Sequence, residues 1–261
     1  MALFDVVGAR RVVAAELGAT TERVVLLNES DWARPTRCTE WTIADLVSHM
    51  GLAALQQAEA FRRAITGDLE PPAFPGAPRM SRDALTEQLQ RGAAELDDAL
   101  GGVPPESLDV MVPLPFGVVP ATVAIQIPVF ESSIHGNDLA AAMGEDEPLA
   151  SAVAAAFIEF APGLLPMLAA GVWKEAVGDL PSPGLAYQLV GASGGIDIAN
   201  HGVGWEIGAA IDDLPTCAIS SDDATLALFL MGRVASSDPR LKISGTAPGA
   251  AENFKSWFPG P

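Results

Sequence analysis

Apolar side chains recur at intervals of three and four residues through most of the first 144 positions, a pattern typical of amphipathic helices. Stretches rich in proline and glycine separate four such segments from one another. The predicted helices cover residues 3–27, 42–66, 81–100 and 120–144. Four helices joined in this way predict a helical bundle.

Local signals mark the ends of the second helix, and a proline lies inside the fourth. Thr42 is suited to be the N-cap of the second helix, because Asp45 stands three residues later in the capping-box position. Gly67 is suited to end that helix. Pro128 lies inside the fourth helix and is expected to kink it or to delay its start, because proline lacks the backbone N–H that a helix interior requires.

The pattern changes in the last third of the chain. A fifth helical stretch over residues 148–171 contains Pro162, which predicts a broken pair of helices. A proline-containing linker follows at residues 179–184. Beyond it come short β-like runs at residues 186–190, 195–199, 205–209, 216–219 and 241–244, with short helices at residues 222–231 and 250–257.

This order of elements predicts two domains. We expect a helical domain over residues 1–178 and a small α+β domain over residues 179–261, because the strands and helices of the second part follow one another without the long helical periodicity of the first. The fold class is therefore mainly α followed by α+β.

The composition excludes several classes of partner. Of 261 residues, 49% are hydrophobic, and 33 Asp and Glu against 15 Lys and Arg give a net charge of −18. Such an acidic surface repels phosphate backbones and anionic lipid headgroups, so neither nucleic acid nor a membrane is an expected partner. The N-terminus lacks the basic-then-apolar order of a signal peptide, and two cysteines are too few for a disulfide framework. We expect a cytoplasmic protein that acts on a small molecule; the oligomeric state stays open.

Three polar side chains on the second and fourth helices suggest a metal site. Glu131 and His135 are four residues apart, so both project from one helix face, and His49 flanks an apolar stripe on the second helix. If these helices are neighbours, two imidazoles and a carboxylate meet in the bundle core, a set that suits zinc first, or iron, manganese or nickel. The alternative is a solvated helix face and a core histidine.

Two stretches resemble a known family. Residues 32–49 read W-x-x-P-T-x-C-x-x-W-T-x-x-D-L-x-x-H, and residues 115–144 contain P-F-G and then E-x-x-x-H-x-x-D-L-A-x-x-x-G. This pattern resembles the mycothiol-dependent maleylpyruvate isomerase family, which belongs to the DinB-like metal-binding four-helix bundles. The later S-D-D-A-T-L-A-L-F-L-M-G-R and S-G-T-A-P-G-A-A-E-N-F runs are similar to the sterol-carrier-like C-terminal domain that such proteins often carry.

The resemblance implies roles for particular residues. The metal ligands of the family fall on His49, Glu131 and His135, and a water molecule or a low-molecular-weight thiol such as mycothiol takes the fourth position. Asp138 is a candidate catalytic residue, as a general base or by orienting a ligand histidine, against the alternative of a solvent-facing carboxylate. Arg233 is a candidate for clamping a substrate carboxylate, against the alternative of a domain-interface salt bridge.

Other residues near these motifs are expected to pack around the site or to shape its surroundings. Relatives commonly have a tryptophan where this chain has Asn137, a departure beside the site that points to a reshaped pocket. Cys38 is expected to pack rather than to act as a nucleophile, and Trp41 to pin the preceding loop against the bundle. Gln56 and Gln57, two turns beyond His49, are candidates for lining a cavity.

Two classes of function follow. The first is a metal-dependent enzyme in which a coordinated thiol assists the isomerisation of a small electrophilic metabolite, or is transferred to it; a close variant hydrolyses a small substrate with metal-bound water. The second is a non-catalytic, metal-binding protein that encloses a small apolar ligand, because a fold does not dictate a function.

Overall fold

The chain forms two compact units that differ in architecture. The computed structural model describes residues 3–38, 40–73, 80–105, 110–145, 147–170, 181–208 and 214–259. Contacts between Cα atoms group residues 4–147 in one unit, and residues 148–261 with the first three residues in the other. The boundary expected between residues 178 and 179 lies outside the described residues, and the division by contacts falls before the long helix α6 (Ser151–Ala170).

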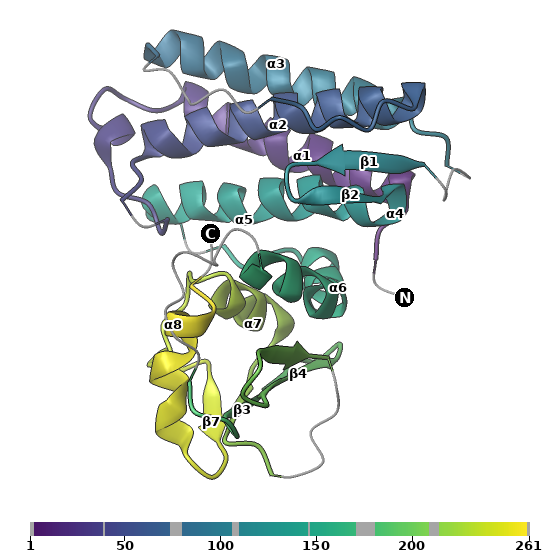
Figure 1. The fold of residues 1–261 in the computed structure, drawn as a ribbon. Coiled ribbons are helices and arrows are strands. Elements are labelled where there is room, and N and C mark those ends of the chain that lie inside the picture. The colour runs from purple at the N-terminus through teal and green to yellow at the C-terminus, as the bar shows by residue number, and fades with distance from the viewer. Residues whose placement is uncertain are drawn as a thin grey trace. The chain divides into compact units, whose positions relative to one another are not determined.

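The unit of residues 4–147 is the expected four-helix bundle. Its long helices are α1 (Val6–Val25), α2 (Ile43–Thr66), α3 (Arg82–Gly101) and α5 (Gln126–Ala142), with a short 3₁₀ turn η1 (Asp31–Ala33) between the first two. Helices α1 and α2 each contact both α3 and α5, so the four helices surround one core (Figure 1). His49 on α2 and Glu131 on α5 therefore belong to neighbouring helices.

The ends of α2 follow the sequence signals. The Thr42 hydroxyl accepts a hydrogen bond from the Asp45 backbone N–H, and the Asp45 carboxylate accepts one from the Thr42 backbone N–H at 2.9 Å, which completes the capping box. Gly67 closes the helix in the left-handed conformation, with φ of 76°. These contacts fix where α2 begins and therefore the direction in which His49 projects.

Helices α2 and α3 approach each other closely at two glycines. A Cβ atom placed on Gly92 would lie 2.7 Å from the backbone oxygen of Gly51, a separation that real side chains do not tolerate. The two backbones therefore touch, and neither position accepts a larger residue without moving a helix.

A β-hairpin that the sequence pattern does not predict precedes α5. Strands β1 (Met111–Leu114) and β2 (Gly117–Pro120) pair antiparallel, and the one-turn helix α4 (Ala121–Ala124) follows. Each strand has only four residues and ends or is interrupted with proline, so neither shows the alternation by which strands are recognised.

The second unit is an α+β fold. Its sheet has the strand order β5-β4-β3-β6-β7, in which β3 pairs parallel with β6 and all other neighbours are antiparallel. The strands are β3 (Ala186–Val190), β4 (Gly195–Asn200), β5 (Trp205–Ile207), β6 (Cys217–Ser220) and β7 (Lys242–Ser244). The other elements are α6, α7 (Asp223–Leu230), the 3₁₀ helix η2 (Pro248–Asn253) and α8 (Phe254–Trp257).

Helix α6 corrects one expectation. It runs without interruption from residue 151 to residue 170 although Pro162 and Pro166 lie inside it, so the predicted broken pair is wrong. The helix contacts α7, β4 and β5, and burial of its apolar side chains there compensates for the two backbone N–H groups that proline removes. Among the described residues, no helix has the length and apolar character needed to cross a bilayer.

A half-buried lysine lies against the aromatic side chains of this unit. The Lys255 ammonium lies 5.3 Å from the centre of the Phe229 ring and donates to the Phe229 carbonyl oxygen. Burial, helped by the nearby charge of Arg233, lowers the pKa of Lys255 to about 7.

We expect Thr42→Ala to destabilise the bundle by about 1 kcal/mol, because it removes the N-cap of α2. Denaturant unfolding of the variant measures this change. Thr66→Ala, at the exposed end of the same helix, is the control and should cost less than half as much; equal losses would contradict the capping role.

We expect the stability of the wild type to rise, relative to Lys255→Met, as the pH increases from 7 to 10. In that interval the unfolded chain binds a proton at Lys255 that the folded chain does not. The unfolding free energy of the wild type therefore rises relative to that of Lys255→Met, by at most about 1.4 kcal/mol per pH unit. Unfolding curves at several pH values measure it, with Lys242→Met at an exposed position as the control. A difference independent of pH would exclude a depressed pKa for Lys255.

Candidate metal centre

The start of α5 determines where the site residues lie. The chain turns at Ile125 between α4 and α5, so Pro128 falls in the first turn of α5, where a backbone N–H has no partner within the helix. Pro128 thus delays the helix as expected and leaves the turns that follow regular. Glu131 and His135 then project from one face, one turn apart.

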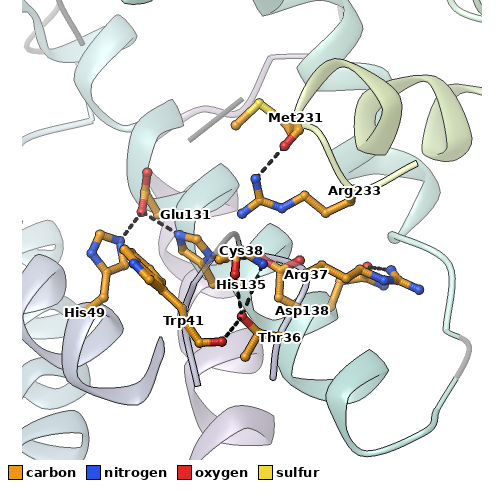
Figure 2. A network of polar contacts seen from close by, with 11 residues as sticks. Thr36, Arg37, Cys38, Trp41, His49, Glu131, His135, Asp138, Met231 and Arg233 are labelled. Carbon is orange, nitrogen blue, oxygen red and sulfur yellow. Dashed lines mark hydrogen bonds and ion pairs between the residues drawn. The ribbon is translucent and has the colours of Figure 1, made fainter. Parts of the chain in front are cut away.

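His49, Glu131 and His135 converge on a common point. The Glu131 Oε2 atom lies 3.2 Å from His49 Nε2 and 3.5 Å from His135 Nε2, and the three ligand atoms lie within 4.8 Å of one another. Figure 2 shows the Glu131 carboxylate between the two imidazoles. His135 is buried, whereas the side chains of His49 and Glu131 are each 35% exposed, so one side of the group is accessible to small molecules.

The charges of these groups depend on one another. Burial alone would raise the pKa of the Glu131 carboxyl, but hydrogen bonds from the two histidines hold it well below its usual range. Burial alone would likewise lower the pKa of His135, but hydrogen bonds to the neighbouring carboxylates and to Cys38 raise it well above its usual value. The group therefore carries an ionised carboxylate and favours a positive charge beside it.

Asp138 lies behind His135, away from Glu131. Its side chain has no exposed surface, and its Oδ2 atom lies 3.0 Å from His135 Nδ1. The solvent-facing alternative for Asp138 is therefore wrong. An N–H donated from Nδ1 to this carboxylate leaves Nε2 as the nitrogen that faces Glu131 and His49.

Two neighbours of the site were given only packing roles by the sequence. The Cys38 thiol donates to Asp138 Oδ2 at 3.2 Å and lies 3.8 Å from His135 Nδ1, so it belongs to the polar network. The Trp41 ring centre lies 4.8 Å from that of His49 and 6.1 Å from that of His135. The available signal was that Cys38 and Trp41 belong to the same motif as His49, but a motif alone does not reveal that the loop before α2 folds over α5.

The remaining candidates lie in different surroundings. Asn137 accepts a hydrogen bond from Arg37 at 3.0 Å and donates one to the Glu147 backbone oxygen, so this departure from the family pattern joins two segments to α5. Arg233 belongs to the second unit, where its guanidinium donates to the Met231 carbonyl after α7. Its role toward a substrate stays a prediction.

Comparisons with known proteins agree with this architecture. Residues 13–140 match the family model "Mycothiol maleylpyruvate isomerase N-terminal domain". Two uncharacterized proteins, from two strains of Mycobacterium tuberculosis, are each 30% identical over 149 residues, which is 57% of this chain and 75% of theirs.

Solved structures share the fold over most of the chain. The crystal structure of the mycothiol-dependent maleylpyruvate isomerase superposes with a TM-score of 0.66 at 16% identity, and that of a histidine-to-alanine mutant with 0.67 at 15%. Each covers 92% of this chain and 93% of the other. The bundle, the sequence match over its helices and the relatives together show that the chain belongs to the family of the mycothiol maleylpyruvate isomerase N-terminal domain.

Proposed function

We propose that the protein is a metal-dependent enzyme that uses a low-molecular-weight thiol, such as mycothiol, to isomerise a small electrophilic metabolite. The observation that carries the proposal is the convergence of His49, Glu131 and His135. The solved relatives are an isomerase that depends on mycothiol, which supports the same class of reaction here.

The three side chains suit a divalent metal. A tetrahedral ion with bonds of about 2.1 Å holds neighbouring ligand atoms about 3.4 Å apart. The separations of Glu131 Oε2 from the two imidazole nitrogens, 3.2 and 3.5 Å, bracket that value. Two imidazoles and one carboxylate leave further coordination positions open, and zinc is the first candidate for this donor set.

Each residue of the site has a definable task. Glu131 stays ionised at neutral pH and supplies negative charge. Asp138 accepts the Nδ1 proton of His135 and so holds that ring with Nε2 directed at the site. Because Asp138 has no exposed surface, we assign it to orienting His135 and not to direct contact with a substrate.

His49, Glu131 and His135 would hold the metal, which would lower the pKa of a coordinated thiol. The thiol would supply a nucleophile for reversible addition to an activated double bond, the chemistry by which a cis double bond can become trans. The partly exposed His49 and Glu131 leave access for a thiol and for a substrate. The Trp41 ring forms a wall beside the two histidines. Arg233 is a further candidate for holding a carboxylate of the substrate.

We expect the protein, purified without an affinity metal, to contain about one equivalent of a divalent metal, and His135→Ala to lose it together with thiol-dependent isomerisation of maleylpyruvate or a related cis-enone. Plasma mass spectrometry measures the metal, and ultraviolet absorbance follows the double bond with and without mycothiol.

His201→Ala is the matched control, because the third histidine is 64% exposed and pairs with Glu206 in the second unit. It should retain both metal and activity. A wild type that holds no metal after reconstitution would refute the metal site. Metal retention without any thiol-dependent reaction would instead favour the non-catalytic binding protein.

We expect Asp138→Asn to weaken metal affinity about 10- to 100-fold without unfolding the bundle, because a neutral amide polarises His135 less than a carboxylate does. Competition with a chelator of known affinity measures this loss, and circular dichroism checks the fold. Asp83→Asn, a carboxylate change at the exposed start of α3, should leave the metal affinity unchanged. Equal affinities of the wild type and Asp138→Asn would exclude the orienting role.

A further inference from the structure

A second set of metal-ligating atoms lies behind the His135 ring, on the side away from Glu131. Cys38 Sγ, Asp138 Oδ2 and His135 Nδ1 lie within 4.8 Å of one another. They come from the loop before α2 and from α5, and none of the three residues exposes more than 5% of its surface. The set shares His135 with the candidate metal centre but uses the other nitrogen of the ring.

The distances within this set suit a single small cation. Asp138 Oδ2 lies 3.2 Å from Cys38 Sγ and 3.0 Å from His135 Nδ1, and the sulfur lies 3.8 Å from that nitrogen. A tetrahedral ion with bonds of about 2.3 Å to sulfur and about 2.1 Å to nitrogen and oxygen holds neighbouring ligand atoms about 3.4 to 3.6 Å apart. Small shifts of the side chains would therefore place all three atoms around one ion.

The loop before α2 holds the Cys38 thiol in this position. The Cys38 backbone N–H donates to the Thr36 hydroxyl at 3.2 Å, and the Cys38 carbonyl accepts from the Trp41 N–H at 3.1 Å. Figure 2 shows the Thr36 hydroxyl joined to both Cys38 and Trp41. Because the backbone is fixed in this way, the thiol needs little further ordering to bind an ion.

The donors differ in charge and in softness from those of the first site. A thiolate and a carboxylate together neutralise a divalent cation, which matters in a place with almost no exposed surface, where net charge is costly. His49, Glu131 and His135 include only one anionic ligand. A thiolate also selects thiophilic ions, whereas imidazole and carboxylate donors accept a wider range of first-row metals.

One imidazole cannot serve both sites while it keeps a proton. An ion behind the ring takes the lone pair of His135 Nδ1, so the hydrogen that the ring retains is on Nε2. The Cys38 thiol releases its proton to solvent in the same step. The His135 Nε2–H then faces Glu131 Oε2, at 3.5 Å, and has no lone pair left for a metal at the first site.

We propose that Cys38, Asp138 and His135 Nδ1 form a second site, which takes a thiophilic divalent cation, and that an ion bound there excludes the metal from the first site. Under the proposed function the second site is inhibitory, because it removes His135 from the metal that would hold the thiol. The existence of the second site does not depend on that function, since two of its three ligands belong to it alone.

Cadmium is a suitable probe, because it is thiophilic and its bond to a thiolate produces an ultraviolet charge-transfer band that imidazole and carboxylate ligands do not produce. The metal-free full chain is titrated with cadmium in its folded state. A second sample is refolded from denaturant in the presence of the ion, so that burial of the site does not prevent entry. We expect a band that saturates at about one equivalent per chain.

Cys38→Ser should lose this band, because serine keeps a hydrogen-bond donor beside Asp138 but supplies no thiolate. Cys217→Ser is the matched control, since Cys217 is also buried but belongs to the second unit, and it should keep the band. His49→Ala removes a ligand of the first site alone and should keep it too. Circular dichroism checks that each variant is folded.

The proposal is overturned if neither wild-type sample forms the band, if Cys38→Ser retains it, or if the two cysteine variants lose it equally.

Zinc-loaded protein tests the exclusion. After addition of cadmium and removal of free ions, plasma mass spectrometry measures both metals per chain. We expect the wild type to exchange zinc for cadmium as the thiolate band appears, and Cys38→Ser to need at least about ten-fold more cadmium for the same loss of zinc. Zinc and cadmium held together by one chain that shows the band would refute the exclusion.

The same samples separate this proposal from the proposed function. A protein that forms the cadmium–thiolate band, but whose Cys38→Ser variant holds no zinc, would retain the second site and refute the metal-dependent reaction. A protein that holds zinc and catalyses the thiol-dependent reaction without ever forming the band would retain the reaction and refute the second site.

Discussion

A carboxylate without access to water must be satisfied by hydrogen-bond donors, and the candidate site depends on how Asp138 meets this requirement. It accepts from the His135 ring and from the Cys38 thiol, which come from α5 and from the loop before α2. The same two contacts orient the imidazole toward Glu131 and hold that loop against the bundle. The orientation of the His135 ring toward the candidate metal site is therefore determined by Asp138 and Cys38, buried groups on the side of the ring away from Glu131.

Much of the fold was predictable because its signals are local. The capping box at Thr42, the glycine that ends α2, and the strands of the second unit all appear in the sequence within one or two residues of their observed places. The hairpin of β1 and β2 was missed because strands of four residues carry too little pattern. The continuity of α6 through Pro162 was missed because packing, which sequence does not show, outweighs two lost hydrogen bonds.

The candidate site, too, was predictable from the sequence in part only. Helical spacing and the family motif together selected His49, Glu131 and His135, and the fold brings their ligand atoms to one point. The contact of Cys38 with Asp138 joins residues 100 positions apart, and no periodicity reports such a contact. Of Gln56 and Gln57, which the sequence offered together, only Gln57 lines a small pocket between the four helices, because the lining depends on which helix faces turn inward together.

The capping box has a consequence for how this protein can change in evolution. Trp41 precedes the N-cap directly, and His49 lies two turns into the helix that the cap begins, so the ring contact between them depends on the number of residues that separates them. Each residue inserted or deleted there would rotate the histidine by about 100° around the helix axis. Changes of length are therefore incompatible with the site between positions 41 and 49, whereas beyond Gly67, where the helix has ended, the chain is free of this constraint.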